Sequence, residues 1–201
     1  MTPFLIIGLG NPGKEYDGTR HNVGFNAVDA ISQNAECKMQ NAKWRKRTTL
    51  HAEILECNIA DHRVILVKPT TFMNESGHAA SALVQSCRLS TVDCRLIVLH
   101  DDLDLPLGTL RLSRGGSSGG HKGVQSTIDA LGTNDFLRLR IGIGPNVTPD
   151  GTRIPAEDFV LKRFGKRERA IIDATITHAV KTTTILLRDG LSAAQRFANV
   201  E

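Results

Sequence analysis

The stretch IIGLGNPGKEYDGTRHNVGF, from Ile6 to Phe25, joins a short apolar run to a polar, glycine-rich segment. The glycines at positions 8, 10 and 13 match the pattern G-x-G-x-x-G of dinucleotide-binding turns. In such a turn the third glycine opens a helix, and an acidic residue about twenty positions later binds the ribose. Here residues 14–22 are polar and contain another glycine, so the spacing of a helix begins only at Val23. The stretch therefore predicts an open turn after a strand, not a cofactor loop.

Outside this turn, the chain alternates between segments with the apolar spacing of strands and of helices. Strands are expected at residues 4–7, 48–59, 63–68, 96–99, 108–112 and 136–143, and a turn at residues 60–62 is expected to join the second and third of them as a hairpin. Helices are expected at residues 23–31, 77–87, 124–131 and 167–188, followed by a short one from Ser192. The alternation predicts an α/β fold in which residues 1–201 form a single domain. Its twisted mixed β-sheet would be flanked by helices on both faces.

The composition limits the class of protein. The chain has 201 residues, of which 40% are hydrophobic, and its length suits one α/β domain. It has no apolar run long enough to cross a membrane, and no basic segment precedes the first strand, so a cytoplasmic protein is expected. The four cysteines, Cys37, Cys57, Cys87 and Cys94, lack the spacing of a metal site. We therefore expect free thiols and no bound metal.

The charge pattern is compatible with an anionic partner. The formal net charge is +4, and basic residues cluster at 43–47 and 162–169. Such an excess suits a nucleic acid, but each cluster alone is typical of an exposed face. A second signal is needed to identify an RNA-binding protein.

Polar clusters follow three of the expected strands, at residues 72–74, 100–106 and 115–123. Sites assemble at strand ends in open α/β sheets. We therefore expect these clusters to meet the glycine-rich turn, which carries Asn11 and His21.

These segments together resemble the bacterial-type peptidyl-tRNA hydrolase family. The resemblance runs from residue 5 to about residue 164. It is carried by GLGNPG (8–13), TRHNVGF (19–25), KPTTFMN (68–74), DDLDLP (101–106), GGH (119–121), RLRIGIG (138–144) and DFVL (158–161). Several long motifs in order are far more specific than the glycine triplet.

The resemblance implies a monomeric hydrolase that needs no cofactor. Its substrate would be peptidyl-tRNA released by stalled ribosomes, whose ester between the peptide and the 3′-ribose it cleaves, so that the tRNA is recycled. By the same resemblance, His21 is the catalytic base, Asp101 orients it, and Asn11 and Asn74 bind the substrate.

Further residues are assigned to the substrate and to the tRNA. The expected substrate-binding residues also include Tyr16, Phe72, Met73, His121 and Lys122. His121 could instead order its loop. Lys122 stands where the family usually has asparagine, and it could meet an RNA phosphate or lie in solvent. The arginines expected to contact tRNA are Arg111, Arg114, Arg138 and Arg140.

These residue types suit the hydrolysis of an ester by water. A neutral histidine can accept the proton of water, a carboxylate can hold its ring, and amides can donate to the oxyanion. The chain has neither G-x-S-x-G nor H-E-x-x-H, which argues against a serine esterase and a zinc hydrolase. His100 and Asp102 are expected to point away from Asp101 if their strand continues. The alternative is a non-catalytic RNA-binding relative on the same scaffold, which Lys122 alone favours.

Overall fold

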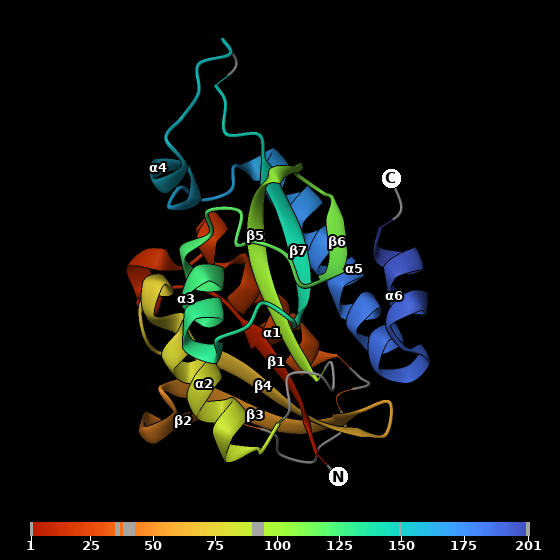
Figure 1. Ribbon diagram of the computed structural model, residues 1–201. Helices are drawn as coiled ribbons and strands as arrows, with labels where there is room; N and C mark the ends of the chain where they lie inside the picture. Colours follow the sequence, from red (N-terminus) through yellow and green to blue (C-terminus); the bar gives the residue numbers. More distant parts are fainter. Residues whose placement is uncertain (1, 35–36, 38–42, 90–94, 149, 200–201) are drawn as a thin grey trace.

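The computed structural model of the chain describes residues 2–34, 37, 43–89, 95–148 and 150–199. These residues form one seven-stranded sheet in the order β2-β3-β4-β1-β5-β7-β6 (Figure 1). Strands β4, β1, β5 and β7 are parallel, whereas β2, β3 and β6 run antiparallel to their neighbours. The strands are β1 Phe4–Gly8, β2 Arg45–Arg47, β3 Ala52–Ile59, β4 His62–Pro69, β5 Leu96–Pro106, β6 Leu110–Arg114 and β7 Leu137–Gly144.

Helices cover both faces of the sheet (Figure 1). The helices α1 (Val23–Gln33), α5 (Lys166–Asp189) and α6 (Leu191–Ala198) contribute to one core, and α2 (Ser76–Ser86) and α3 (Lys122–Leu131) to the other. The short helix α4 (Ala156–Val160) lies beyond the end of the sheet (Figure 1). The predicted α/β class and its mixed, doubly covered sheet are therefore confirmed.

Most predicted elements are present, with changes at their ends. The predicted hairpin is formed by β3 and β4, although residues 48–50 form a 3₁₀ turn instead of strand. Strand β5 is longer than expected and includes the polar residues from His100 to Pro106. Strand β2 and helix α4 were not predicted. Cys37, Cys57 and Cys87 are free thiols as expected, and Cys94 lies outside the described residues.

The glycine-rich turn brings α1 against β1 and opens no helix at residue 13. Gly13 has a φ of 115°, and only a 3₁₀ turn, Lys14–Tyr16, follows it. A Cβ atom on Gly8 would lie 2.2 Å from the carbonyl oxygen of Gly24 in α1, which no side chain could accommodate. The glycines therefore serve close packing of backbone, and the prediction of a turn without a cofactor helix is confirmed.

None of the helices within the described ranges is long and apolar enough to cross a membrane.

Candidate active site

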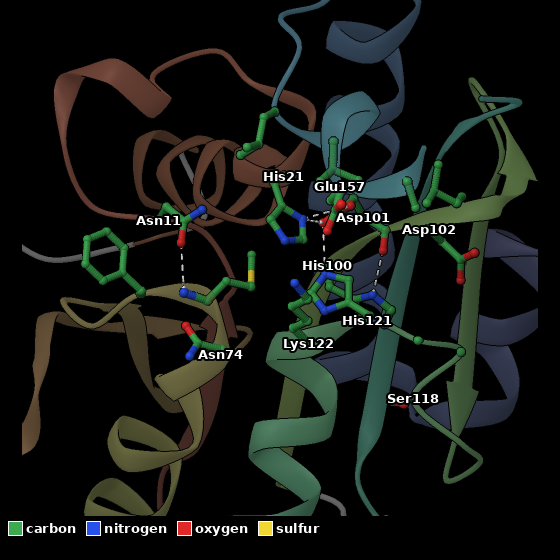
Figure 2. Close-up of a pocket in the computed structure, with 18 of the residues that line it drawn as sticks. Asn11, His21, Asn74, His100, Asp101, Asp102, Ser118, His121, Lys122 and Glu157 are labelled. Atoms are coloured by element: carbon green, nitrogen blue, oxygen red, sulfur yellow. Dashed lines mark hydrogen bonds and ion pairs between the residues drawn. The ribbon is translucent and has the colours of Figure 1, made fainter. Parts of the chain in front are cut away.

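The cleft forms where β5 extends beyond β1. The two strands pair as far as Gly8 opposite Leu99, after which β1 ends and β5 continues beside β7. The β1 side of β5 is therefore open to other segments from residue 100 onward. Loops, β5, α3 and α4 enclose a cavity of about 580 Å³ there, into which His21 and Asp101 both face (Figure 2).

His21 and Asp101 form a buried pair in this cavity (Figure 2). His21 lies in the 3₁₀ turn Arg20–Asn22, and its Nδ1 is 2.9 Å and 3.1 Å from the two carboxylate oxygens of Asp101. The carboxylate can only accept hydrogen bonds while ionised, so Nδ1 carries the ring proton and donates it. Nε2 then holds the lone pair, and it has no hydrogen bond to any residue that the structure describes. The two residues that the sequence paired are thus in direct contact.

Arg20 holds the turn that carries His21. Its guanidinium makes two hydrogen bonds of 2.8 Å with the Glu168 carboxylate and one of 2.7 Å to the carbonyl oxygen of Arg163. The same group lies over the rings of Phe159 and Phe164, at 4.4 Å and 5.1 Å from their centroids. Arg20 therefore ties the turn that carries His21 to the segment between α4 and α5. Local sequence patterns did not indicate this role of Arg20.

Asn11 is fixed with its amide nitrogen free. Its side-chain oxygen accepts a hydrogen bond of 2.8 Å from the backbone nitrogen of Met73, so the opposite end of the amide is the donor. The Asn22 side chain bonds to both backbone groups of Asn11, at 2.8 Å and 2.9 Å. Asn22 precedes α1, but its side chain makes no cap bond to that helix. The Asn11 NH₂ group has no partner among the described residues and belongs to a residue that lines the cavity.

The remaining residues of this side form the mouth of the cavity. Phe72 is 53% exposed and meets the ring of Tyr16 edge-on, with centroids 6.3 Å apart. Asn74 is exposed and lines the cavity, whereas Met73 is buried at 4% exposure beneath Gly123. The structure therefore brings Phe72, Met73 and Asn74 to the cavity as predicted. Tyr16 does not line the cavity itself, but its ring contacts Phe72 at the mouth of the cavity.

His121 contacts the carboxylate of Asp101. Its Nε2 lies 2.9 Å from Asp101 Oδ1, and its Nδ1 accepts hydrogen bonds of 3.2 Å from the backbone of Gly123 and Val124. The sequence placed His121 beside the cleft but did not identify Asp101 as its partner. The next residue, Lys122, is exposed, lines the cavity and makes no ion pair with any described residue.

Burial and neighbouring imidazoles shift two pKa values on β5. Burial alone would raise the pKa of Asp101, but His21 and His121 outweigh it by charge and by hydrogen bonds, and hold this pKa well below its usual range. Burial, with His121 and Arg138 nearby, lowers the pKa of His100 to about 3. Asp101 is therefore an anion and His100 is neutral at any pH near neutrality.

His100 and Asp102, the neighbours of Asp101 in β5, bond to groups other than the Asp101 carboxylate. The Nδ1 of His100 donates to the carbonyl oxygen of Asp101 at 2.8 Å, and its ring meets that of His121 edge-on, with centroids 4.8 Å apart. Asp102 accepts a hydrogen bond of 2.6 Å from Arg140. Both residues nevertheless line the cavity.

Arg138 occupies a different place from the other predicted tRNA contacts. It is only 5% exposed, and its Nη1 donates to the carbonyl oxygen of Ser117 at 2.6 Å. It therefore holds the glycine-rich loop, residues 115–120, against the sheet. Sequence polarity could not reveal this, because the loop that covers Arg138 follows a different strand.

The other three arginines lie near the surface. Arg140 pairs with Asp102 and has 31% of its side chain exposed, and Arg111 stands opposite it in the β6–β7 register. Arg114 forms two hydrogen bonds, of 2.6 Å and 2.8 Å, with Asp135. Arg111 and Arg140 therefore share one face of the sheet beside the cleft.

Helix α4 closes the cavity on the side opposite α3 (Figure 2). Ala156, Glu157, Val160 and Leu161 contribute to the lining, and Leu161 is 46% exposed. The sequence did not assign these residues to the site, although the motif at residues 158–161 pointed to this segment. A five-residue helix shows too little periodicity to be identified.

The side chains at the polar centre of the cavity are linked by hydrogen bonds. One donor atom each from His21, Asp101 and His121 lie within 4.8 Å of one another, as in a metal site. Metal binding needs the lone pair of a ring nitrogen. The nitrogens that face Asp101 carry protons instead, because the carboxylate only accepts and His121 Nδ1 already accepts two backbone bonds.

Comparisons with known proteins identify the family. The family model described as Peptidyl-tRNA hydrolase matches residues 5–201. A peptidyl-tRNA hydrolase of Dehalococcoides mccartyi is 46% identical over 195 residues, covering 96% of this chain and 98% of the relative. One of Thermodesulfovibrio yellowstonii is 40% identical over 196 residues, covering 98% of each chain.

Solved structures agree with the sequence comparisons. The crystal structure of peptidyl-tRNA hydrolase from Acinetobacter baumannii superposes with a TM-score of 0.87 at 30% identity, covering 99% of this chain and 95% of that one. The resemblance stated from the motifs is therefore confirmed over nearly the whole chain. The chain belongs to the peptidyl-tRNA hydrolase family.

Proposed function

We propose that the protein hydrolyses the ester bond that joins a peptide, or an N-blocked aminoacyl group, to the 3′-ribose of tRNA. The observation that carries this proposal is the buried His21–Asp101 pair, with His21 Nδ1 held at 2.9 Å from the carboxylate. This contact leaves the basic Nε2 of His21 for the open cavity. Family membership supports peptidyl-tRNA as the substrate.

In the proposed reaction, His21 activates water. A water oxygen attacks the ester carbonyl carbon while His21 Nε2 takes the water proton. The Asp101 carboxylate stabilises the imidazolium that forms, because it lies against the opposite ring nitrogen. When the tetrahedral intermediate collapses, the bond between the carbonyl carbon and the ribose O3′ breaks. The His21 proton then passes to O3′, which leaves His21 neutral again.

The amides at the other wall of the cavity would stabilise the oxyanion. Asn11 is 8% exposed and is held by three hydrogen bonds, so its free NH₂ group is already oriented before substrate binds. A preoriented donor stabilises developing charge better than a mobile one. Asn74, which is exposed, would bind the substrate farther out, and Tyr16, Phe72 and Met73 would contact its apolar groups.

The tRNA would lie along the side of the cleft formed by β6, β7 and α3. Arg111, Arg140 and Lys122 offer cations there, and Arg114 lies at the end of the same strand as Arg111. Phosphates are bound by such cations in a salt-dependent way. Arg138 would act on the tRNA only indirectly, through the loop that it holds. We further infer a monomer located in the cytoplasm.

The alternative is a non-catalytic RNA-binding protein on the same scaffold. Lys122, in place of the usual asparagine, is the feature that favours it. The alternative does not explain why a buried carboxylate and a histidine form a pair within an open cavity. The catalytic proposal explains both the pair and the free amide of Asn11.

The experiment is turnover of N-acetyl-aminoacyl-tRNA by purified wild-type protein and by His21→Ala. We expect wild-type turnover and a loss of about 10³–10⁴-fold in the variant, because a positioned base contributes a factor of that order. The affinity of both proteins for uncharged tRNA should be equal. His78→Ala, which changes an exposed histidine on α2, is the control and should keep full activity.

Two results would count against the proposal. Wild-type protein that binds tRNA without turnover would favour the RNA-binding alternative. A His21→Ala variant that loses tRNA affinity and rate to the same extent would make His21 structural.

A further inference from the structure

His121 has a fixed tautomer. Its Nδ1 lies 3.2 Å from two backbone nitrogens, those of Gly123 and Val124, at the start of α3. Backbone N–H groups only donate, so Nδ1 must present its lone pair to them. The ring proton of neutral His121 is therefore on Nε2. One side chain thus caps α3 and carries a donor on its far edge.

That donor is directed at the oxygen on which His21 depends. The Nε2 of His121 and the Nδ1 of His21 each lie 2.9 Å from Oδ1 of Asp101. The two rings are 5.0 Å apart between centroids. His121 has 7% of its side chain exposed and Asp101 only 2%, so water competes little for the carboxylate. Two donors from different elements therefore share one buried acceptor.

The other charged and titratable groups around this pair have other partners or face the cavity. His100 is neutral and donates to the Asp101 carbonyl oxygen, and the carboxylate of Asp102 is paired with Arg140. Lys122 of α3 and Glu157 of α4 line the cavity, and neither side chain forms a hydrogen bond or an ion pair with Asp101. Among the described residues, His21 and His121 are thus the two whose side chains bond to the Asp101 carboxylate.

We propose that His121 is a positioning residue that sets the basicity of His21 through Asp101. Its hydrogen bond holds the Asp101 carboxylate in place and partly neutralises the negative charge that would otherwise stabilise protonated His21. A larger share of His21 then stays neutral, and can accept a proton, at the pH of the reaction. This inference rests on the proposed function, in which His21 is the base.

The direction of the effect follows from the charge on Asp101. Without the His121 donor, the full carboxylate charge acts on His21 and stabilises its imidazolium. The pKa of His21 must then rise, because hydrogen bonds and nearby charges shift a pKa toward the form that they stabilise. The acid limb of kcat/KM reports the base of the free enzyme. It should move to higher pH.

Two substitutions separate this role from capping of the helix. In His121→Asn, the amide oxygen stands near the place of Nδ1 and caps α3, as asparagine commonly does, but nothing reaches Asp101. In His121→Gln, the amide nitrogen stands near the place of Nε2 and can donate to Asp101, while the cap is weakened. The two variants therefore exchange the two functions of one histidine.

The experiment measures kcat/KM against pH, the Tm, and the pKa of His21 by NMR titration for wild type and both variants. We expect the acid limb and the His21 pKa to rise in His121→Asn and to stay near wild type in His121→Gln. The Tm should fall more in His121→Gln than in His121→Asn.

The proposal is overturned if the His21 pKa is the same in wild type and His121→Asn, or if it follows the Tm across the variants. Because the NMR titration needs no turnover, the result is distinct from failure of the proposed function. That function would fail through absence of hydrolysis by the wild-type protein.

Discussion

The two loops that meet at Asp101 are held in different ways. Residues 11–22 are held by the reciprocal bonds of Asn11 and Asn22 and by the partly buried ion pair of Arg20 with Glu168. The glycine-rich loop, residues 115–120, is fixed mainly from outside, by Arg138 beneath it and by His121 at its end. Gly119 and Gly120, moreover, have space around them.

This difference separates chemistry from substrate binding. A base and an oxyanion donor must stay within tenths of an ångström of one geometry, and the first loop carries the residues that we propose for both roles. The second loop borders the face that we assign to tRNA, which varies in shape and needs less rigid contacts. The two loops meet at Asp101. Its carboxylate bonds to His21 of the first loop and to His121 directly after the second.

The largest effect is expected from Asp101→Asn, which breaks this meeting point. Its amide nitrogen can donate to His21 Nδ1 and move the ring proton to Nε2, where it blocks uptake of a proton from water. We predict a loss of about 10³–10⁴-fold in kcat with little change in KM. Single-turnover hydrolysis of N-acetyl-aminoacyl-tRNA measures it. A loss confined to KM would show that Asp101 does not act through His21.

The next effect is expected from Arg20→Gln, which loosens the first loop. It removes one partner of an ion pair whose arginine side chain is 7% exposed, and we predict a loss of about 2–3 kcal/mol in the free energy of unfolding. Activity should fall as well, since His21 is adjacent. Urea denaturation measures the stability.

Arg63→Gln is the matched control for this prediction. Its ion pair with Glu56 is 53% and 46% exposed, so the loss should be under about 1 kcal/mol. Equal losses in the two variants would contradict the assigned role of Arg20.

A smaller effect is expected from His100→Asn, which tests the support beneath Asp101. Burial lowers the pKa of His100 to about 3. Between this value and the ordinary histidine pKa of about 6.5, the unfolded chain binds a proton that the folded chain does not. The free energy of unfolding therefore has its full value above about pH 6.5 and decreases as the pH falls toward 3. Asparagine does not titrate.

The variant should therefore reduce the slope of unfolding free energy against pH by up to about 1.4 kcal/mol per pH unit in this window. Urea denaturation at pH 6.5, 5.5 and 4.5 measures the slope. Parallel curves for wild type and variant would contradict the assignment.

The smallest effect is expected on the side of the second loop, and it separates Arg140 from Arg138. Arg140→Gln should weaken tRNA binding several-fold and reduce the slope of log K against log salt by about 1, if Arg140 meets a phosphate. Arg138→Met removes the bond to Ser117 and should leave this slope unchanged. Filter binding of tRNA at several salt concentrations measures both. Equal slopes for Arg140→Gln and wild type would place Arg140 outside the interface.

The sequence predicted the parts of the molecule that local patterns determine. Strand β1, helix α1 and the β3–β4 hairpin follow from apolar spacing and from a turn at residues 60–62. The meeting of His21 and Asp101 followed from the family motifs and from the rule that polar strand ends gather at one edge. These features depend on few long-range details.

The features that the sequence did not predict depend on contacts between distant segments. The polar residues of β5 after Leu99 remain strand because β7 pairs with them, which no local pattern shows. Arg138 is buried because a loop from another connection covers it, and His121 finds Asp101 across twenty residues. Helix α4 is too short to show a helical period, so the residues with which it lines the cavity were not predicted.

The central claim is that Asp101 holds the proton of neutral His21 on Nδ1 and leaves Nε2 as the free base. Nitrogen-15 NMR of the imidazole rings, recorded above the pKa of His21 and assigned with His21→Ala, tests this directly. The account predicts a protonated Nδ1 and an unprotonated Nε2 for His21 in the wild-type enzyme. A protonated Nε2 in the neutral ring would contradict it, since such a ring could not accept a proton from water in the cleft.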